Sequence, residues 1–181
     1  MATVQAIPVR DTFSTWDFFY GLDMALACLI SYSLTTRVLS PFVAEPDTLL
    51  GGMWATVATV FVFRETRASS LAAGISRLIA TGVSFALCLV YLVVLPFHPV
   101  GLAVLLGMGT AIMMYLGRRD DIVTTGITTV VVMVVAAMSP QDAWHQPLLR
   151  LVDTVVGIAV GVACKWIASL LYYRSIGKPA R

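Results

Sequence analysis

The sequence predicts an all-α membrane protein in which six transmembrane helices form two inverted three-helix repeats. The prediction rests on an apolar composition and on continuous apolar runs. Hydrophobic residues make up 59% of the 181 residues and charged residues only 12%, against ~25% in an ordinary soluble domain. A soluble domain needs more polar side chains to cover its surface, so a soluble enzyme and a disordered chain are excluded. The net charge of +2 is too small for a nucleic-acid-binding module.

Prolines separate the apolar runs and, because they lack a backbone hydrogen-bond donor, mark helix ends. All eight prolines lie outside the runs. The predicted transmembrane segments are residues 16–39, 48–63, 75–95, 100–117, 122–138 and 148–173. The second and fifth are shorter than the roughly 20 residues that a membrane-crossing helix needs. A β-barrel is excluded, because the runs are continuously apolar and do not alternate with polar residues.

Each segment is justified by its neighbours along the chain. The first contains Asp17 and Asp23 and is too long for the core of a signal peptide, so it is predicted to be a span. The second follows a loop with two prolines, and the third follows the basic turn at 64–67. The fourth ends at the paired arginines 118–119, the fifth is rich in threonine, and the sixth ends before the basic tail at 174–181.

Basic residues gather on one side of the predicted spans. Eight of the twelve lie there, namely Arg10, Arg64, Arg67, Arg118, Arg119, Arg174, Lys178 and Arg181. The opposite loops carry no Lys or Arg. Because cytoplasmic loops are enriched in these residues, we expect a cell (inner) membrane protein with both termini in the cytoplasm. The chain then divides into a cytoplasmic segment 1–15, a transmembrane domain 16–173 and a cytoplasmic tail 174–181.

The third and sixth segments have similar sequences. Residues 77–81 read Arg-Leu-Ile-Ala-Thr and residues 150–154 read Arg-Leu-Val-Asp-Thr. A unit of three spans inserts its second copy upside down, so residues 16–95 and 100–173 are predicted to be an inverted repeat of the kind common in transporters. The three cysteines all lie in apolar runs. We therefore expect no disulfide, no metal site and no cofactor.

Three stretches together resemble a known family. Residues 53–62 follow an acidic loop, residues 74–82 follow the basic turn, and residues 149–161 come near the end. Their arrangement resembles the membrane domain of the fusaric acid resistance and aromatic acid exporter family, which plant aluminium-activated malate transporters also resemble. The resemblance covers roughly residues 18–171. It implies efflux of organic anions, with aromatic carboxylates as the expected substrates, by six-helix units that work in pairs. We therefore expect a homodimer in the lipid bilayer.

Cations inside the spans are the candidate anion ligands, because charge near hydrocarbon is costly and marks function by default. In the third segment Arg77 and Thr81 share one helical face, and in the sixth Arg150, Thr154 and Lys165 share another. At 1.5 Å per residue, Arg150 and Lys165 lie about 22 Å apart along the helix. An anion drawn in by one cation could then be passed to the other.

Each of these cations has an alternative role that involves no substrate. Arg77 and Arg150 can extend to lipid headgroups, and Lys165 can reach the inner interface. Arg150 can also pair with Asp153, one turn further along the helix.

The second and fifth segments supply further candidates for the substrate path. Thr56 and Thr128 carry hydroxyls that can bond either a substrate or a carbonyl of their own helix. Trp54 can stack on an aromatic substrate or lie in the belt of aromatic residues at the membrane interface. Gly157 and Gly161 in the sixth segment form a small-xxx-small pattern and are predicted to be helix-packing contacts.

Asp23 is the candidate proton-coupling residue, since it lies about a third of the way into the first span. Alternatively, it forms a static ion pair with Arg77 or Lys165. A carrier coupled to the proton gradient needs Asp23, whereas a passive anion channel does not.

Two other classes are weighed against a transporter. An enzyme is not expected, because the two histidines lie in loops and no phosphate-binding loop is present. A non-transporting membrane subunit of a larger transport complex, with a separate soluble or membrane partner, fits the short loops. The ionised groups inside the spans argue against that subunit.

Overall fold

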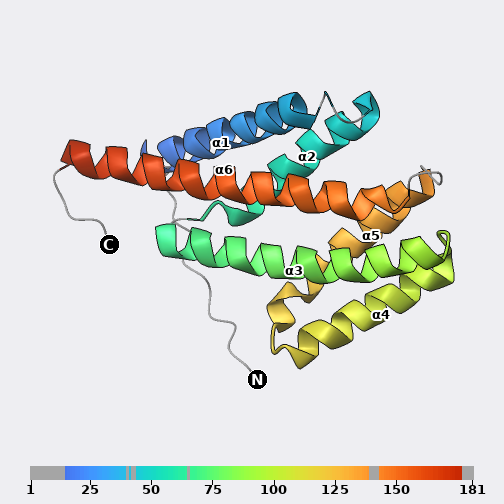
Figure 1. The fold of residues 1–181 in the computed structure, drawn as a ribbon. Coiled ribbons are helices and arrows are strands. Elements are labelled where there is room, and N and C mark those ends of the chain that lie inside the picture. The colour runs from blue at the N-terminus through green and yellow to red at the C-terminus, as the bar shows by residue number, and fades with distance from the viewer. Residues whose placement is uncertain (1–14, 40, 42–43, 65, 139–142, 177–181) are drawn as a thin grey trace, which may run out of the picture.

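The computed structural model describes residues 15–39, 41, 44–64, 66–138 and 143–176 (Figure 1). This part of the chain is all-α, as predicted. Its elements are α1 (Thr15–Leu39), α2 (Glu45–Val62), α3 (Arg67–Val94), α4 (Pro99–Tyr115), the 3-10 helix η1 (Arg119–Asp121), α5 (Ile122–Met138) and α6 (His145–Ile176). The predicted cytoplasmic segments 1–15 and 174–181 lie largely outside the described residues, and α6 continues past the predicted boundary at residue 173.

Four of these helices are long and apolar enough to cross a membrane. They are Asp17–Val38, Arg67–Val94, Arg119–Met138 and His145–Leu170, so the chain is a multi-pass membrane protein. α4 is a shorter apolar helix, and α2 has only 18 residues with two acids in its first turn. α5 has the predicted bounds 122–138, and with η1 directly before it the apolar stretch Arg119–Met138 reaches 20 residues.

Local signals explain where the helices begin. Thr66 and Ser69 form a capping box at the start of α3, in which each side chain accepts a hydrogen bond from the backbone of the other. Pro99 occupies the first turn of α4, where its missing N–H costs nothing. After α4 the chain reverses at Gly117, whose φ of 69° suits glycine.

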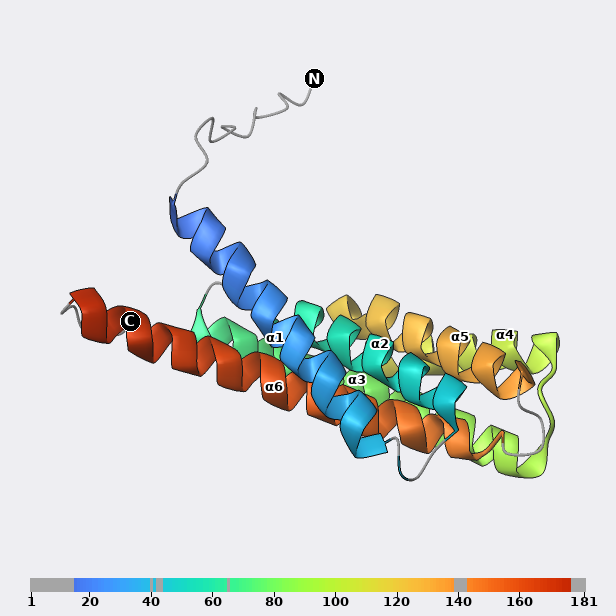
Figure 2. The ribbon, with the colours of Figure 1, turned by 90° about the horizontal axis from the view of Figure 1, so that it is seen from above.

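α3 and α6 pack against each other in antiparallel orientation, and each of the other four α-helices packs against at least one of them (Figures 1 and 2). α2 packs on α6, and α5 packs on α3. α1 covers α2 and α6, while α4 covers α5 and α3, so that α1 and α4 lie on opposite sides of the bundle (Figure 1). We call the end where α1 begins and α6 finishes the terminal end. The hairpin end is the opposite one, where the α1–α2, α3–α4 and α5–α6 connections lie.

The interior of this bundle holds many polar side chains together with an apolar core cluster that includes Leu105 and Met133, and the outside carries large apolar side chains. Val90, Val94 and Met138 are among many large apolar side chains that are more than half exposed. The buried uncharged polar residues include Ser31, Thr35, Thr59, Ser70, Thr81, Ser84, Thr125, Thr128, Thr129 and Thr154. This distribution is typical of a protein whose outer surface faces lipid and whose polar groups face one another or a pathway.

Candidate functional site

Arg77 lies inside the bundle, on the face of α3 that meets α2. Its side chain is only 3% exposed, so it does not extend to lipid headgroups. The guanidinium carbon lies 4.4 Å from the ring centre of Phe61 and 5.6 Å from that of Trp54. None of the three guanidinium nitrogens has a hydrogen-bond partner among the described residues. Arg77 is therefore a buried cation held between two aromatic rings of α2, with all its donors unused.

Two further buried donors near Arg77 are also unused. The indole nitrogen of Trp54 and the hydroxyl of Thr81, one turn along α3 from Arg77, have no hydrogen-bond partner in the described parts of the chain. Trp54 is 3% exposed, so it lies inside the bundle and not in an interfacial aromatic belt. Because unpaired buried polar groups are costly, three of them in one region call for a ligand.

Arg150 and Asp153 form a buried ion pair on α6. The Nη1 atom of Arg150 lies 2.9 Å from Oδ2 of Asp153, and the two side chains are 1% and 0% exposed. The contact is an ion pair without a hydrogen bond, since none of the three Arg150 nitrogens and neither Asp153 oxygen has a hydrogen-bond partner within the described ranges. The alternative in which Arg150 pairs with Asp153 is thus the one observed. The residue three positions after Arg77 is Ala80, so Arg77 has no such acid.

Lys165 lies near the terminal end of the bundle, so that Arg77 lies between Lys165 and Arg150 along the helix axes. Its Nζ atom is 4.7 Å from the ring centre of Tyr20 and 5.0 Å from that of Phe63. The Tyr20 hydroxyl donates a hydrogen bond to the Phe63 carbonyl at 3.2 Å, which fixes α1 against the end of α2. Asp23 is half-buried on α1 and interacts electrostatically with Lys165. α1 therefore brings a carboxylate to this cation.

The three cations form a series along α3 and α6. A Cβ atom on Gly74 would lie 3.0 Å from Ile158 and 3.6 Å from Val162, which fixes the relative depth of α3 and α6. At 1.5 Å per residue, the level of Arg77 is roughly 10 Å from that of Arg150 and roughly 12 Å from that of Lys165. The unpaired Arg77 thus lies between two cations that each have an acid nearby.

Three of the four predicted site threonines, all but Thr81, use their hydroxyl protons within their own helices. Thr56 donates to the Gly52 carbonyl, Thr128 to that of Thr124 and Thr154 to that of Arg150, at 2.8–2.9 Å. Their oxygens keep acceptor capacity but offer no free donor to an anion. These threonines are consequently suited to forming the wall of a path and not to holding an anion.

Closely packed contacts attach α2 to α6 and α5 to α3. The Thr59 hydroxyl lies 3.0 Å from the Gly157 carbonyl, and a Cβ atom on Gly157 would lie 2.2 Å from the Ala55 carbonyl oxygen. On the other side, the Ser84 hydroxyl donates to the Thr125 carbonyl at 2.8 Å and lies 3.0 Å from the Thr129 hydroxyl. Gly161 also faces Thr59, where a Cβ would be 3.3 Å from the carbonyl oxygen.

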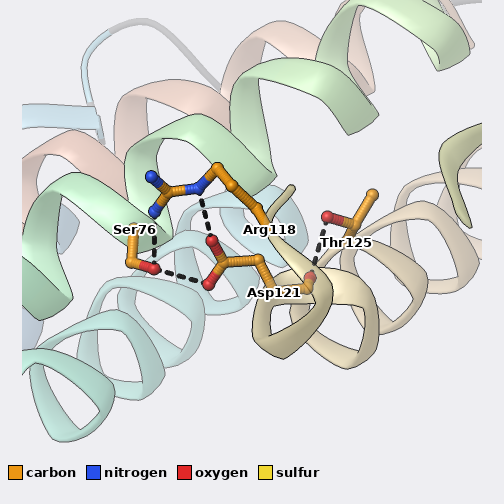
Figure 3. A network of polar contacts seen from close by, with 4 residues as sticks. All are labelled: Ser76, Arg118, Asp121 and Thr125. Carbon is orange, nitrogen blue, oxygen red and sulfur yellow. Dashed lines mark hydrogen bonds and ion pairs between the residues drawn. The ribbon is translucent and has the colours of Figure 1, made fainter. Parts of the chain in front are cut away.

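A polar cluster near the terminal end was missed by the sequence reasoning (Figure 3). Arg118 contacts Oδ2 of Asp121 at 2.7 Å and donates to the Ser76 hydroxyl at 2.9 Å, and Ser76 donates to Oδ1 of Asp121. Thr125 donates to the Asp121 backbone carbonyl at 3.0 Å. Arg118 was interpreted only as an orientation signal, although the acid three residues later was a cue for pairing. The cluster attaches α5 to α3 next to Arg77.

A smaller contact holds the hairpin end. The Gln146 amide donates to Asp47 at 3.3 Å and thereby joins the first turns of α6 and α2. Gln146 is one turn before Arg150 and is 1% exposed. Polar contacts therefore hold both ends of the bundle, since at the terminal end Arg67 of α3 also donates to the Ser169 hydroxyl of α6 at 2.7 Å.

The lipid-facing exterior and the buried cations define a polytopic membrane protein with a polar interior. The chain belongs to the fusaric acid resistance protein-like family, whose match covers residues 24–164. This confirms the resemblance given by the sequence, and the family suggests efflux transport. Comparisons with curated proteins and with solved structures find no match.

Proposed function

We propose that the protein exports organic anions, with aromatic carboxylates as its substrates, and that Arg77 holds the anion during transport. The observation that carries this proposal is the buried guanidinium with three unused nitrogens between two aromatic rings. A guanidinium binds a carboxylate through two parallel hydrogen bonds. The Phe61 and Trp54 rings offer flat apolar surfaces to an aromatic ring that enters with the carboxylate.

The free-energy cost of Arg77 supports this assignment. A buried charge without a partner destabilises a protein by several kcal/mol, so a purely structural role favours an apolar residue at this position. An anionic substrate supplies the missing partner whenever it is bound. Lys165 at the terminal end and Arg150 toward the hairpin end extend the same series, and α2 and α5 form the walls between them.

We also propose that α1–α3 and α4–α6 are an inverted repeat. In this repeat α1 corresponds to α4, α2 to α5 and α3 to α6. Under this correspondence every packed pair of α-helices matches a pair that is also packed, so that α2 on α6 corresponds to α5 on α3. The polar contacts follow the same exchange, because Ser84 and Gly157 each lie seven residues after an arginine and each contacts a threonine of the neighbouring helix. Such repeats carry substrate sites near the membrane midplane.

Transport by purified protein in liposomes tests the proposal. We expect benzoate to cross the membrane faster than in protein-free liposomes, and a transmembrane proton gradient to change the rate of its transport. Succinate provides the aliphatic comparison. Benzoate movement that ignores the gradient would indicate the passive channel, and no movement by folded protein would favour the non-transporting subunit.

Replacement of Asp23 by asparagine separates the carrier from the channel. We expect Asp23→Asn to lower gradient-driven benzoate transport to the rate without a gradient, because the half-buried carboxylate beside Lys165 no longer exchanges protons. Uptake of labelled benzoate with and without a pH gradient measures this effect. Asp120→Asn, at an exposed acid of η1, is the matched control. Full gradient dependence in Asp23→Asn would contradict the assignment.

A further inference from the structure

Asp153 is a buried acid that the proposed transport has not yet used. One oxygen of its carboxylate lies 2.9 Å from the Arg150 guanidinium, but neither oxygen has a hydrogen-bond partner in the described part of the chain. Arg150 has five N–H donors, and none of its three nitrogens has a hydrogen-bond partner there either. The pair is thus electrically neutral but not hydrogen-bonded, with capacity to bind a second carboxylate at Arg150.

We propose that Asp153 is the internal counter-ion of Arg150 and accepts a proton when Arg150 binds the carboxylate of a transported anion. This inference rests on the proposed function. The proton comes from solvent: an O–H bond of hydronium breaks as an O–H bond forms on the Asp153 carboxylate, and a water molecule is left behind. The carboxylate of the anion then accepts hydrogen bonds from the Arg150 guanidinium.

The charge balance at the site is the reason for this coupling. The empty pair of Arg150⁺ and Asp153⁻ has no net charge, and the loaded site, with Asp153 protonated and one anion bound, has none either. An anion bound beside an ionised Asp153 would leave one uncompensated negative charge in the interior. Two carboxylates about 5 Å apart repel each other enough to weaken binding roughly a hundredfold at an effective dielectric constant near 20.

The charged groups around the pair reinforce this effect. Asp47 of α2 interacts electrostatically with both Arg150 and Asp153 and accepts a hydrogen bond from Gln146. It therefore adds a second negative charge at the hairpin end. α5 has no ionisable side chain. On α3 the charged group inside the bundle is Arg77, roughly 10 Å deeper by helix rise. On α1 the cation of the hairpin end is Arg37, which is exposed in the last turn.

Proton uptake during benzoate binding tests the inference on the full chain in detergent. Purified protein in a weakly buffered solution at about pH 8, where benzoate is ionised, is titrated to saturation while the pH is recorded. We expect the wild-type protein to take up about one proton per molecule at saturation, because binding of the anion and binding of the proton are linked. Asp153→Asn is expected to take up none while still binding benzoate.

A second variant covers the case in which Asp153→Asn does not fold, since it leaves Arg150 unpaired. Arg150→Gln with Asp153→Asn removes both charges, and we expect it to bind benzoate at Arg77 without proton uptake. Asp120→Asn is the control that keeps the uptake. Benzoate binding without proton uptake in the wild type, or uptake that persists in a folded Asp153 variant, overturns the inference and leaves the proposed function standing. If the wild-type protein binds no benzoate, the proposed function fails and the inference fails with it.

Discussion

Replacement of Arg77 by glutamine is expected to reduce benzoate transport to the rate of protein-free liposomes. Glutamine keeps a polar side chain of moderate length but loses the positive charge and the planar set of donors that lie between Phe61 and Trp54. Arg77→Lys is expected to retain only part of the activity, because an ammonium group keeps the charge without the paired donors. Uptake of labelled benzoate in proteoliposomes measures both effects.

The stability of the same variant distinguishes a substrate-binding role from a structural one. Because the Arg77 guanidinium is buried without a hydrogen-bond partner in the described residues, replacing its charge by a neutral amide is expected to leave the protein equally stable or more stable. Arg119→Gln, at an exposed arginine of η1, controls for the loss of one positive charge. A folded Arg77→Gln protein with normal transport would show that the anion does not pass through this site.

Replacement of Gly157 by alanine is expected to destabilise the bundle by about 2 kcal/mol. The new Cβ atom would lie 2.2 Å from the Ala55 carbonyl oxygen and 2.7 Å from the Ala58 Cβ atom, so α2 and α6 must move apart. That movement also weakens the bond from the Thr59 hydroxyl to the Gly157 carbonyl. Thermal unfolding in detergent measures the loss.

Two other glycines provide controls in the same kind of helix. Gly82→Ala meets no atom within 4 Å, so it is expected to be neutral or to stabilise α3 by about 0.5–1 kcal/mol through its higher helix propensity. Gly161→Ala, with a nearest contact of 3.3 Å, is expected to fall between the two. Equal melting temperatures for Gly157→Ala and Gly82→Ala would mean that α2 and α6 are not packed so closely.

The helical class and the six helices could be predicted because they depend on composition and on proline breaks along the chain. The lengths of individual spans could not. The sequence pattern began the fifth segment at residue 122, where α5 does begin, but it did not predict the 3-10 helix at 119–121 that brings this apolar stretch to 20 residues. Whether a turn continues a helix depends on tertiary contacts such as those of Asp121, which local pattern does not contain. The membrane orientation and the expected homodimer remain predictions.

The ionised candidates of the site were found because charge is rare in apolar runs and each instance stands out. Their partners were harder to predict. Arg150 and Asp153 are three residues apart on one helix, so their pairing was foreseeable, whereas the placement of Arg77 between two rings of α2 depends on how α2 meets α3. The Ser76–Arg118–Asp121 cluster joins segments more than 40 residues apart in sequence. The residues that neighbour Ser76 in the sequence gave no indication of this contact.

The difference between Ala80 and Asp153 has a consequence for the direction of transport. Two identical halves in opposite orientation would make a molecule that looks the same from both sides of the membrane and conducts equally well in either direction. Here one half has an arginine with an acid and the other has an arginine without one. In the proposed inverted repeat, this departure from symmetry gives the proposed pathway two unlike ends. A transporter built in this way is expected to have unequal rates inward and outward under the same driving force.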